Sequence, residues 1–296
     1  MSFEQVFQYI LAGVTSGSIY AIVAIGFNII YNTTGIINFA QGEFVMIGGM
    51  TAISLANVLP LPIAILIAVV VTAVVGGLLD LLFIRRLKEP SVLNMVIVTI
   101  GISIILRELA LHVWDEKVRS LPYFTGSEVT SIRILGAYIS PQVLWVIGVS
   151  AVIVIFLGVF FKFTMTGRAM RACASNLTAA RLCGINVGTM VTISFMLSAA
   201  IGALAGCVIS PLTQTKYDCG ASLAIKGFTV AILGGLGNSS GAVIGGIIVG
   251  LLEAFSISIL PLAYKDAIAI ALMLVILFVR PGGILGSKEA AGLKEF

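Results

Sequence analysis

Hydrophobic residues run along this chain in long blocks, and charged residues are confined to the segments between them. Between Gln5 and Gly42 there is no Asp, Glu, Lys or Arg, and after Glu43 the next charged residue is Asp80. A helix needs about 20 mostly apolar residues to cross a bilayer core of roughly 30 Å. The pattern predicts membrane-spanning helices at residues 6–30, 36–58, 61–84, 92–112, 142–162, 191–211, 240–260 and 264–280.

A ninth apolar stretch, residues 224–236, is shorter and ends in the glycine-rich run 234–237. It is either a half-helix or a short crossing packed inside a bundle, where protein can satisfy an irregular backbone. The predicted fold is therefore all-α, a polytopic membrane helix bundle with 8 to 9 transmembrane segments. We expect residues 1–296 to form a single transmembrane domain.

Composition supports a membrane protein, and the placement of charge predicts its orientation. Only 10% of the residues are charged and 59% are hydrophobic, whereas soluble domains carry roughly a quarter charged residues. Lys and Arg gather at 85–88, 162–181 and 280–294, which predicts that these segments are cytoplasmic. In the loop 113–141 acids offset the bases, so we expect an extracytoplasmic loop. If 224–236 crosses, which we favour, the N-terminus lies outside.

Few residues could support enzymatic chemistry. The chain has one histidine, His112, and four cysteines without CxxC spacing, which we expect to be small buried thiols. It has no GxxxxGK[ST] loop to bind nucleotide phosphates. The sequence therefore predicts no enzyme, no metal site and no cofactor; if ATP drives this protein, another chain binds it.

The predicted cytoplasmic loop 164–190 contains an alanine-rich, basic stretch from Gly167 to Asn186. Alanine favours helix, and Gly184 can end that helix in a left-handed conformation. Such a short amphipathic helix could be a mechanical contact for a soluble partner. It could equally be a loop that only anchors topology.

Several motifs resemble the branched-chain amino acid permease family of bacterial ATP-binding-cassette (ABC) importers. The spacing Ala179-Ala180-x3-Gly184 resembles the coupling loop that contacts the ATPase subunit in such permeases. The family resemblance extends to the ranges 13–22, 35–43, 167–186, 234–237, 264–266 and 280–286. It therefore runs through nearly the whole chain.

The resemblance implies a multi-pass permease subunit of the bacterial inner membrane that translocates leucine, isoleucine and valine by alternating access. It implies three kinds of partner: a homologous second permease subunit, two cytoplasmic ATP-binding subunits and an extracytoplasmic substrate-binding protein. The implied ATPase-coupling residues are Arg168, Arg171, Ala179, Ala180, Arg181 and Gly184. Where the family commonly has acids this loop has Ser175, Asn176 and Thr178, so docking would rely on the arginines.

Polar residues within or beside the spans are the candidates for the translocation pathway. They are Asn28, Asn38, Gln41, Glu43 and Glu253. Glu253 lies in an otherwise uncharged span, where an ionised carboxylate is costly unless it is paired, hydrated or neutralised. Each candidate could instead cap a helix or tie helices together. Glu108 and His112 are four residues apart and could pair; we expect them, with Arg107, to be structural.

Two alternatives remain open at this point. The same machine could carry urea, amides or other amino acids. The chain could also be an ATP-independent secondary transporter, although such carriers usually have intramembrane ionisable residues as coupling sites, and Glu253 is the clear example here.

Overall fold

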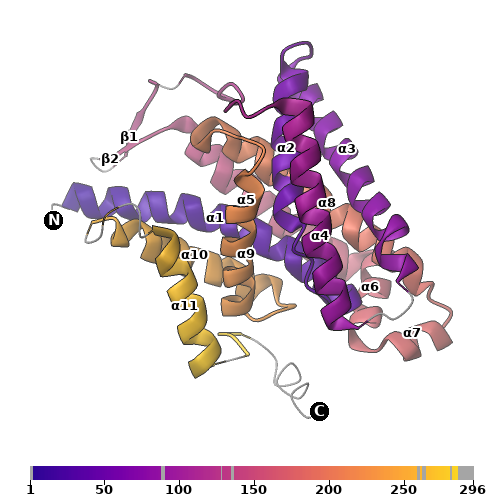
Figure 1. The fold of residues 1–296 in the computed structure, drawn as a ribbon. Coiled ribbons are helices and arrows are strands. Elements are labelled where there is room, and N and C mark those ends of the chain that lie inside the picture. The colour runs from indigo at the N-terminus through magenta and orange to yellow at the C-terminus, as the bar shows by residue number, and fades with distance from the viewer. Residues whose placement is uncertain are drawn as a thin grey trace. The chain divides into compact units, whose positions relative to one another are not determined.

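The computed structural model describes residues 3–87, 91–127, 129–134, 137–258, 261, 265–280 and 282–285. Its long helices are α1 (Phe3–Thr34), α2 (Gln41–Ala56), α3 (Leu61–Leu82), α4 (Val92–Trp114), α5 (Pro141–Phe163), α8 (Val187–Thr213), α9 (Cys219–Gly234), α10 (Ser239–Ser256) and α11 (Lys265–Val279) (Figure 1). The short ones are η1 (Ile84–Arg86), α6 (Met165–Ser175) and α7 (Leu177–Leu182). Several residues within the ranges used above lie outside the described residues: Lys88, Glu128, Tyr264, Pro281, Gly286, Lys288 and Lys294.

The helices follow the predicted apolar blocks. Six stretches of the described chain are long and apolar enough to cross a membrane. They are Phe3–Thr34, Leu61–Arg86, Leu93–Trp114, Pro141–Phe163, Val187–Thr213 and Ser239–Ser256, and Cys219–Gly234 is a shorter apolar helix. The helix predicted over 36–58 starts later, at Gln41, because Gly35 leaves α1 with a positive φ of 72° and the chain is not helical until residue 41.

The connection between α4 and α5 contains an antiparallel pair that the sequence did not predict. Strand β1 (Ile132–Ile134) pairs with β2 (Ala137–Ile139), with Ile132 opposite Ile139. Each strand is three residues long, so the described fold is helical apart from this small hairpin.

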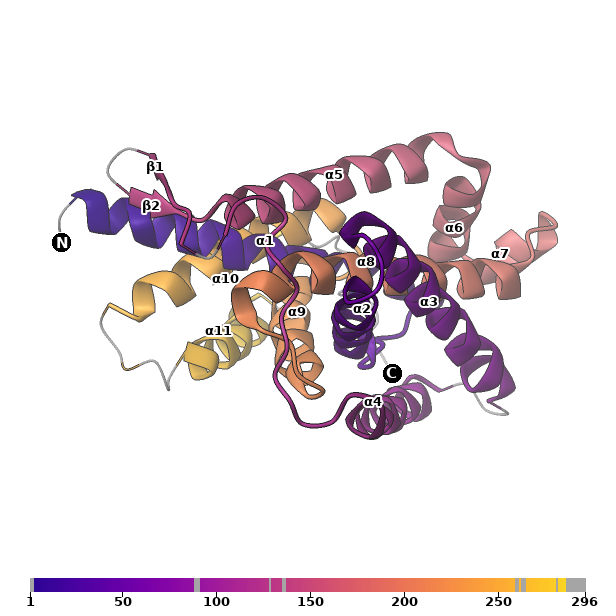
Figure 2. The same cartoon turned by 90° about the horizontal axis from the view of Figure 1, so that it is seen from above.

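The chain divides into two compact units, each made of separate stretches of sequence. In the second unit, residues 26–121 and 152–224, α8 packs against α2 and α3 (Figures 1 and 2). Gly202 faces the Phe44 side chain, and Gly206 lies against the main chain at Val45 and Gly49. This is the small-xxx-small pattern by which membrane helices approach closely.

The first unit comprises residues 1–25, 122–151 and 225–296. Here α1 and α10 touch through their main chains: a Cβ on Gly17 would lie 2.5 Å from the carbonyl oxygen of Gly246. Gly13 and Gly250 make the same kind of contact one turn further along each helix. Four glycines thus form a seam between α1 and α10 that admits no side chain.

The end of the described chain closes against the turn between α9 and α10. Gly235 and Gly237 adopt positive φ values of 98° and 86° there. The main-chain nitrogen of Ile284 donates to the carbonyl of Leu233 at 2.7 Å, and Asn238 Nδ2 donates to the carbonyl of Leu285 at 2.9 Å. Residues 282–285, from one stretch that carries the family resemblance, therefore meet the turn that contains another, 234–237, within the first unit.

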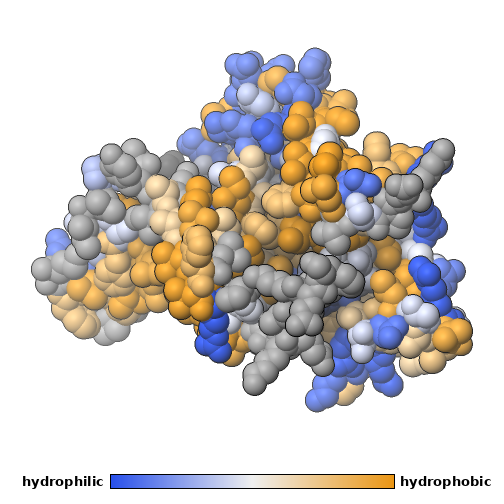
Figure 3. Space-filling view, turned by 60° about the horizontal axis from the view of Figure 1, so that its bottom comes forward, coloured by the Kyte–Doolittle hydropathy of each residue, from blue (hydrophilic) through white to orange (hydrophobic). Residues whose placement is uncertain are grey.

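Large apolar side chains lie on the surface as well as in the core. Leu66, Val152 and Phe278 are each more than half exposed, and hydrophobic residues cover much of the face in Figure 3. Soluble proteins rarely expose contiguous apolar patches of more than a few hundred Å². A hydrocarbon solvent removes the cost of such a surface.

Candidate functional site

One of the predicted pathway residues, Asn38, lies in the break between α1 and α2, and two others lie in the helices that flank it. Asn38 is buried, and its Oδ1 accepts a hydrogen bond from the main-chain nitrogen of Ala40 at 3.1 Å. Its Nδ2 is buried and has no hydrogen-bond partner among the described residues. Gln41 is also fully buried, at the start of α2. Asn28, in α1, is buried too.

Gln41 joins three helices of the second unit. Its Oε1 lies 2.6 Å from Ser198 Oγ on α8, and its Nε2 donates to the Ser198 carbonyl at 3.3 Å. The Ser198 hydroxyl also lies 2.8 Å from the carbonyl oxygen of Gly26 on α1. A Cβ on Gly26 would collide with the Gln41 amide, so the glycine makes room for this contact.

Glu43, in the first turn of α2, is 1% exposed and only partly compensated. Ser103 Oγ donates to its Oε1 at 2.9 Å, and a terminal guanidinium nitrogen of Arg107 lies 3.6 Å from the same oxygen. Among the described residues Oε2 has no hydrogen-bond partner, and it lies against the backbone at Gly220. Burial of Glu43 therefore leaves one carboxylate oxygen without compensation from the described residues.

The contact between Arg107 and Glu43 revises one expectation from the sequence. The predicted partners Glu108 and His112 do not pair through their side chains; His112 Nδ1 lies 2.8 Å from the main-chain oxygen of Glu108. Residue 107 instead lies beside a carboxylate on another helix. The cysteine expectation also needs correction, because Cys183 is exposed, although Cys173 and Cys207 are buried.

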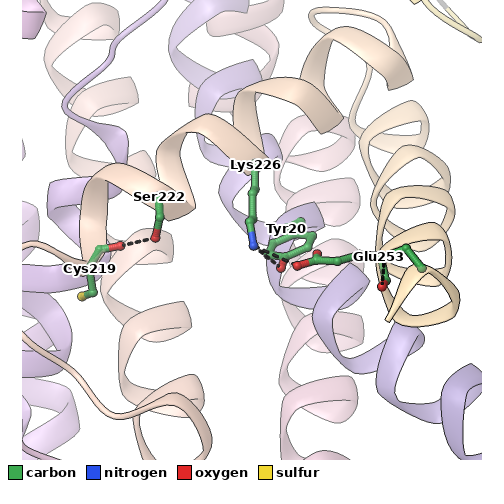
Figure 4. Close-up of polar contacts among 6 residues, drawn as sticks. Tyr20, Cys219, Ser222, Lys226 and Glu253 are labelled. Carbon is green, nitrogen blue, oxygen red and sulfur yellow. Dashed lines mark hydrogen bonds and ion pairs between the residues drawn. The ribbon is translucent and has the colours of Figure 1, made fainter. Parts of the chain in front are cut away.

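The first unit contains a buried ion pair, of which the sequence predicted the glutamate but not its partner. Glu253 on α10 and Lys226 on α9 point toward each other beside Tyr20 of α1 (Figure 4). Lys226 Nζ donates to Glu253 Oε1 at 2.9 Å and to the Tyr20 hydroxyl at 3.2 Å, and the lysine and glutamate side chains are 11% and 2% exposed. The ion pair supplies the compensation that Glu253 requires.

The basic segment between α5 and α8 forms two short helices rather than one. Asn176 interrupts it with an extended backbone, and its Oδ1 caps α7 by accepting from the Ala179 nitrogen at 2.9 Å. Gly184 ends α7 with a positive φ of 79°, as predicted. The Ile185 nitrogen donates to the carbonyl of Ala180, which is the wider bond of a Schellman motif.

This segment is amphipathic. Met170, Cys173 and Ala180 are buried, and burial raises the pKa of the Cys173 thiol. The residues predicted to contact an ATPase lie mostly on the other face: Arg168, Arg171, Ala179, Arg181 and Gly184 are exposed. The arginines are therefore available to a partner, whereas Ala180 serves internal packing.

Long apolar helices with buried carboxylates and a basic amphipathic connection are the features of a multi-pass membrane protein. Comparison with known proteins gives the family. Residues 9–277 match the family of branched-chain amino acid transport system permease components. The chain belongs to this family, so it is a multi-pass inner-membrane permease of a multi-subunit ABC transport system.

Curated relatives cover nearly the whole length. The chain is 33% identical to the high-affinity branched-chain amino acid transport system permease protein BraD of Pseudomonas aeruginosa, over 95% of this chain and 96% of the relative. It is also 33% identical to the permease protein LivH of Escherichia coli, with the same coverage. A more distant relative is the ribose import permease RbsC of Haemophilus influenzae, 23% identical over 92% of this chain and 84% of RbsC.

Among solved structures the fold resembles a chain of PsaBC from Streptococcus pneumoniae in complex with Fab. The TM-score is 0.53 at 11% sequence identity, over 98% of this chain and 96% of that chain. This similarity concerns the fold alone.

Proposed function

We propose that this chain translocates leucine, isoleucine and valine across the inner membrane as a permease subunit of an ATP-driven importer. The observation that carries the proposal is 33% identity, along nearly the full chain, to permeases named for high-affinity branched-chain amino acid transport. The alternative cargoes are urea, amides and other amino acids. The ribose permease, at 23% identity, is an example of a more distant relative with a different named cargo.

The proposed assembly has a homologous second permease subunit, two cytoplasmic ATP-binding subunits and an extracytoplasmic substrate-binding protein. ATP hydrolysis belongs to the separate subunits. ATP binding would favour one state of the permease pair over the other, and this differential free energy would drive alternating access.

The proposed topology has nine crossings with the N-terminus outside. In the second unit Thr34 at the end of α1 lines the same cavity as the basic residues Arg85 and Arg181, which supports a cytoplasmic end for α1. Counting crossings from there through α2, α3, α4, α5, α8, α9, α10 and α11 brings Arg280 back to the cytoplasmic side. The stretch 224–236 then crosses as part of α9.

Coupling to ATP hydrolysis is proposed for the segment 164–190. The exposed Arg168, Arg171 and Arg181 would meet acidic or carbonyl groups of the ATPase, and the bends at Asn176 and Gly184 would fix their direction. Arg171→Glu with Arg181→Glu should abolish uptake while ATP hydrolysis by the assembled subunits continues. Unaltered coupling in this variant, with Lys162→Glu as the charge-matched control, would dismiss the role.

For the translocation pathway we propose Asn28, Asn38, Gln41, Glu43 and Glu253. Support at Glu43 and Asn38 comes from the buried polar atom that each has without a hydrogen-bond partner among the described residues. Such atoms can take up hydrogen bonds from a passing amino acid. Gln41 and Glu253 would contribute by holding the helices that frame the pathway.

The decisive experiment is uptake of radiolabelled leucine into vesicles containing this chain. The chain is tested alone and with its candidate permease partner, ATPases, binding protein and internal ATP. Uptake only with the full set is the expected result. ATP-dependent uptake of urea or an amide in place of leucine would change the cargo, and uptake by the chain alone would overturn the assignment.

A further inference from the structure

The second unit contains a cavity that the proposed pathway residues do not line. It has a volume of about 340 Å³ and is formed by the C-terminal ends of α1 and α3, the N-terminal ends of α4 and α8, η1 and helix α7. Small-molecule sites typically measure roughly 300–1,000 Å³. The cavity lies at the end of this unit that carries Arg85 and the basic segment.

Three charged residues of both signs face this cavity: Asp80, Arg85 and Arg181. Asp80 is 1% exposed, and its Oδ2 accepts a hydrogen bond from Thr192 Oγ1 at 2.6 Å. Arg85 donates to the same hydroxyl at 3.3 Å. Thr192 therefore links the acid to the base.

The rest of the wall is mostly apolar. Ile36, Ile84, Met95, Val187 and Val191 line it, and these side chains could enclose a short branched hydrocarbon. The acid can bind an ammonium group, the two guanidinium groups can bind a carboxylate, and the apolar wall can contact a small hydrocarbon side chain. An amino acid with a small apolar side chain carries all three groups. Guanidinium groups are well suited to bind carboxylates through paired hydrogen bonds.

We propose that this cavity is a second amino-acid site, distinct from the translocation pathway and open to the cytoplasmic side. The ammonium group of a branched-chain amino acid would bind Asp80, its carboxylate would bind Arg85 and Arg181, and its side chain would contact Val191 and the other apolar residues. The cargo named here rests on the proposed function. The site itself rests on the cavity and its charges.

Occupancy of this site has a consequence for coupling, because Arg181 belongs both to the cavity and to the segment proposed to dock the ATPase. A carboxylate that binds Arg181 competes with the ATPase for the same guanidinium. An amino acid accumulating inside the cell therefore lowers the rate of its own import.

The test uses the complete transporter in proteoliposomes with internal ATP, with or without internal unlabelled leucine. The initial rate of radiolabelled leucine uptake should fall at least about fivefold with internal leucine in the unmodified protein, which corresponds to about 1 kcal/mol. Val191→Phe fills the cavity, so it should keep the uptake rate measured without internal leucine and lose the inhibition by internal leucine. Val152→Phe, at a side chain 65% exposed on α5, is the matched control and should retain it.

A binding measurement keeps the inference testable if Val191→Phe does not fold or if uptake fails. Radiolabelled leucine is bound to the purified full chain in nanodiscs without the binding protein. Asp80→Asn should weaken this binding about tenfold, since a charge-assisted hydrogen bond is lost. The 2-oxo acid analogue of leucine, which lacks the ammonium group, should bind no better to the unmodified chain than to Asp80→Asn.

The outcomes separate the two proposals. Leucine uptake that proceeds at the same rate with and without internal leucine would overturn the cavity site and leave the import function intact. Inhibition that persists in Val191→Phe would also overturn it, because the ligand would then act elsewhere. Leucine binding in nanodiscs that is weakened by Asp80→Asn, in a transporter that shows no leucine uptake, would support the site and count against the assigned import.

Discussion

The two compact units each bury a glutamate in a helix, and they compensate its charge differently. In the first unit Glu253 receives a lysine at 2.9 Å, and that lysine also donates to Tyr20. In the second unit Glu43 accepts a hydrogen bond from Ser103, but the nearest guanidinium nitrogen lies 3.6 Å from its Oε1. The first arrangement, with the cation within hydrogen-bonding distance, suits a structural role in holding helices together. In the second the charge of the carboxylate is compensated more weakly.

The largest effect is expected from breaking the ion pair between Lys226 and Glu253. Lys226→Met leaves Glu253 buried without its cation, which should cost about 3–5 kcal/mol of stability. Thermal unfolding of the purified chain in detergent, followed by circular dichroism, measures the loss. Lys216→Met breaks an exposed pair with Asp218 and should change stability by less than about 1 kcal/mol.

A double variant sharpens this prediction. Lys226→Met combined with Glu253→Leu removes both charges, and an apolar replacement of a buried ion pair is often neutral. We expect the melting temperature to recover most of its loss. A double variant as unstable as Lys226→Met alone would show that the ion pair is not what Lys226 contributes.

An intermediate effect is expected at Glu43. Glu43→Gln keeps the shape of the side chain and removes the charge, so uptake should fall about tenfold, the value of a charge-assisted hydrogen bond. The melting temperature should change little, because Glu43 is only partly compensated. Glu108→Gln, an exposed acid of α4, is the control and should transport normally; a loss of stability without a loss of uptake would give Glu43 the structural role instead.

The smallest effect is expected at Tyr20. Tyr20→Phe removes one hydrogen bond to Lys226 and retains the ring, whose centroid lies 5.3 Å from Nζ. A loss of about 1 kcal/mol in stability with unchanged uptake is expected. A fall in uptake comparable to that of Glu43→Gln would mean that the two glutamates are less different than their contacts indicate.

Local patterns predicted the helices well. Apolar blocks placed them within a few residues, and Gly184 ended α7 in the conformation its sequence suggested. The cap at Asn176, which splits the basic segment, had a signal in the sequence, since Asn is a favoured N-cap residue. The three-residue strands in the connection between α4 and α5 had no comparable signal.

The partners of the charged residues were harder to predict because they come from distant parts of the chain. Tyr20 and Lys226 are 206 positions apart, and Glu43 and Ser103 are 60 apart. A lone lysine inside the apolar stretch 224–236 was a usable signal for a buried partner, and Glu253 was the candidate. For Asp80 and Arg181 the sequence contains no sign that they line one cavity, since that depends on how the ends of α1, α3, α4 and α8 meet η1 and α7.

The division of the sequence between the two units has a consequence for biosynthesis. The second unit contains nothing beyond residue 224, so all of its residues have left the ribosome while the chain is still being made. The first unit combines the first 25 residues with residues from 225 onward, and the Leu233 carbonyl receives its bond from Ile284. Helix α1, the first to enter the membrane, can therefore form its glycine seam only after α10 has been synthesised. Until then the exposed glycine face of α1 is best protected by membrane insertion factors.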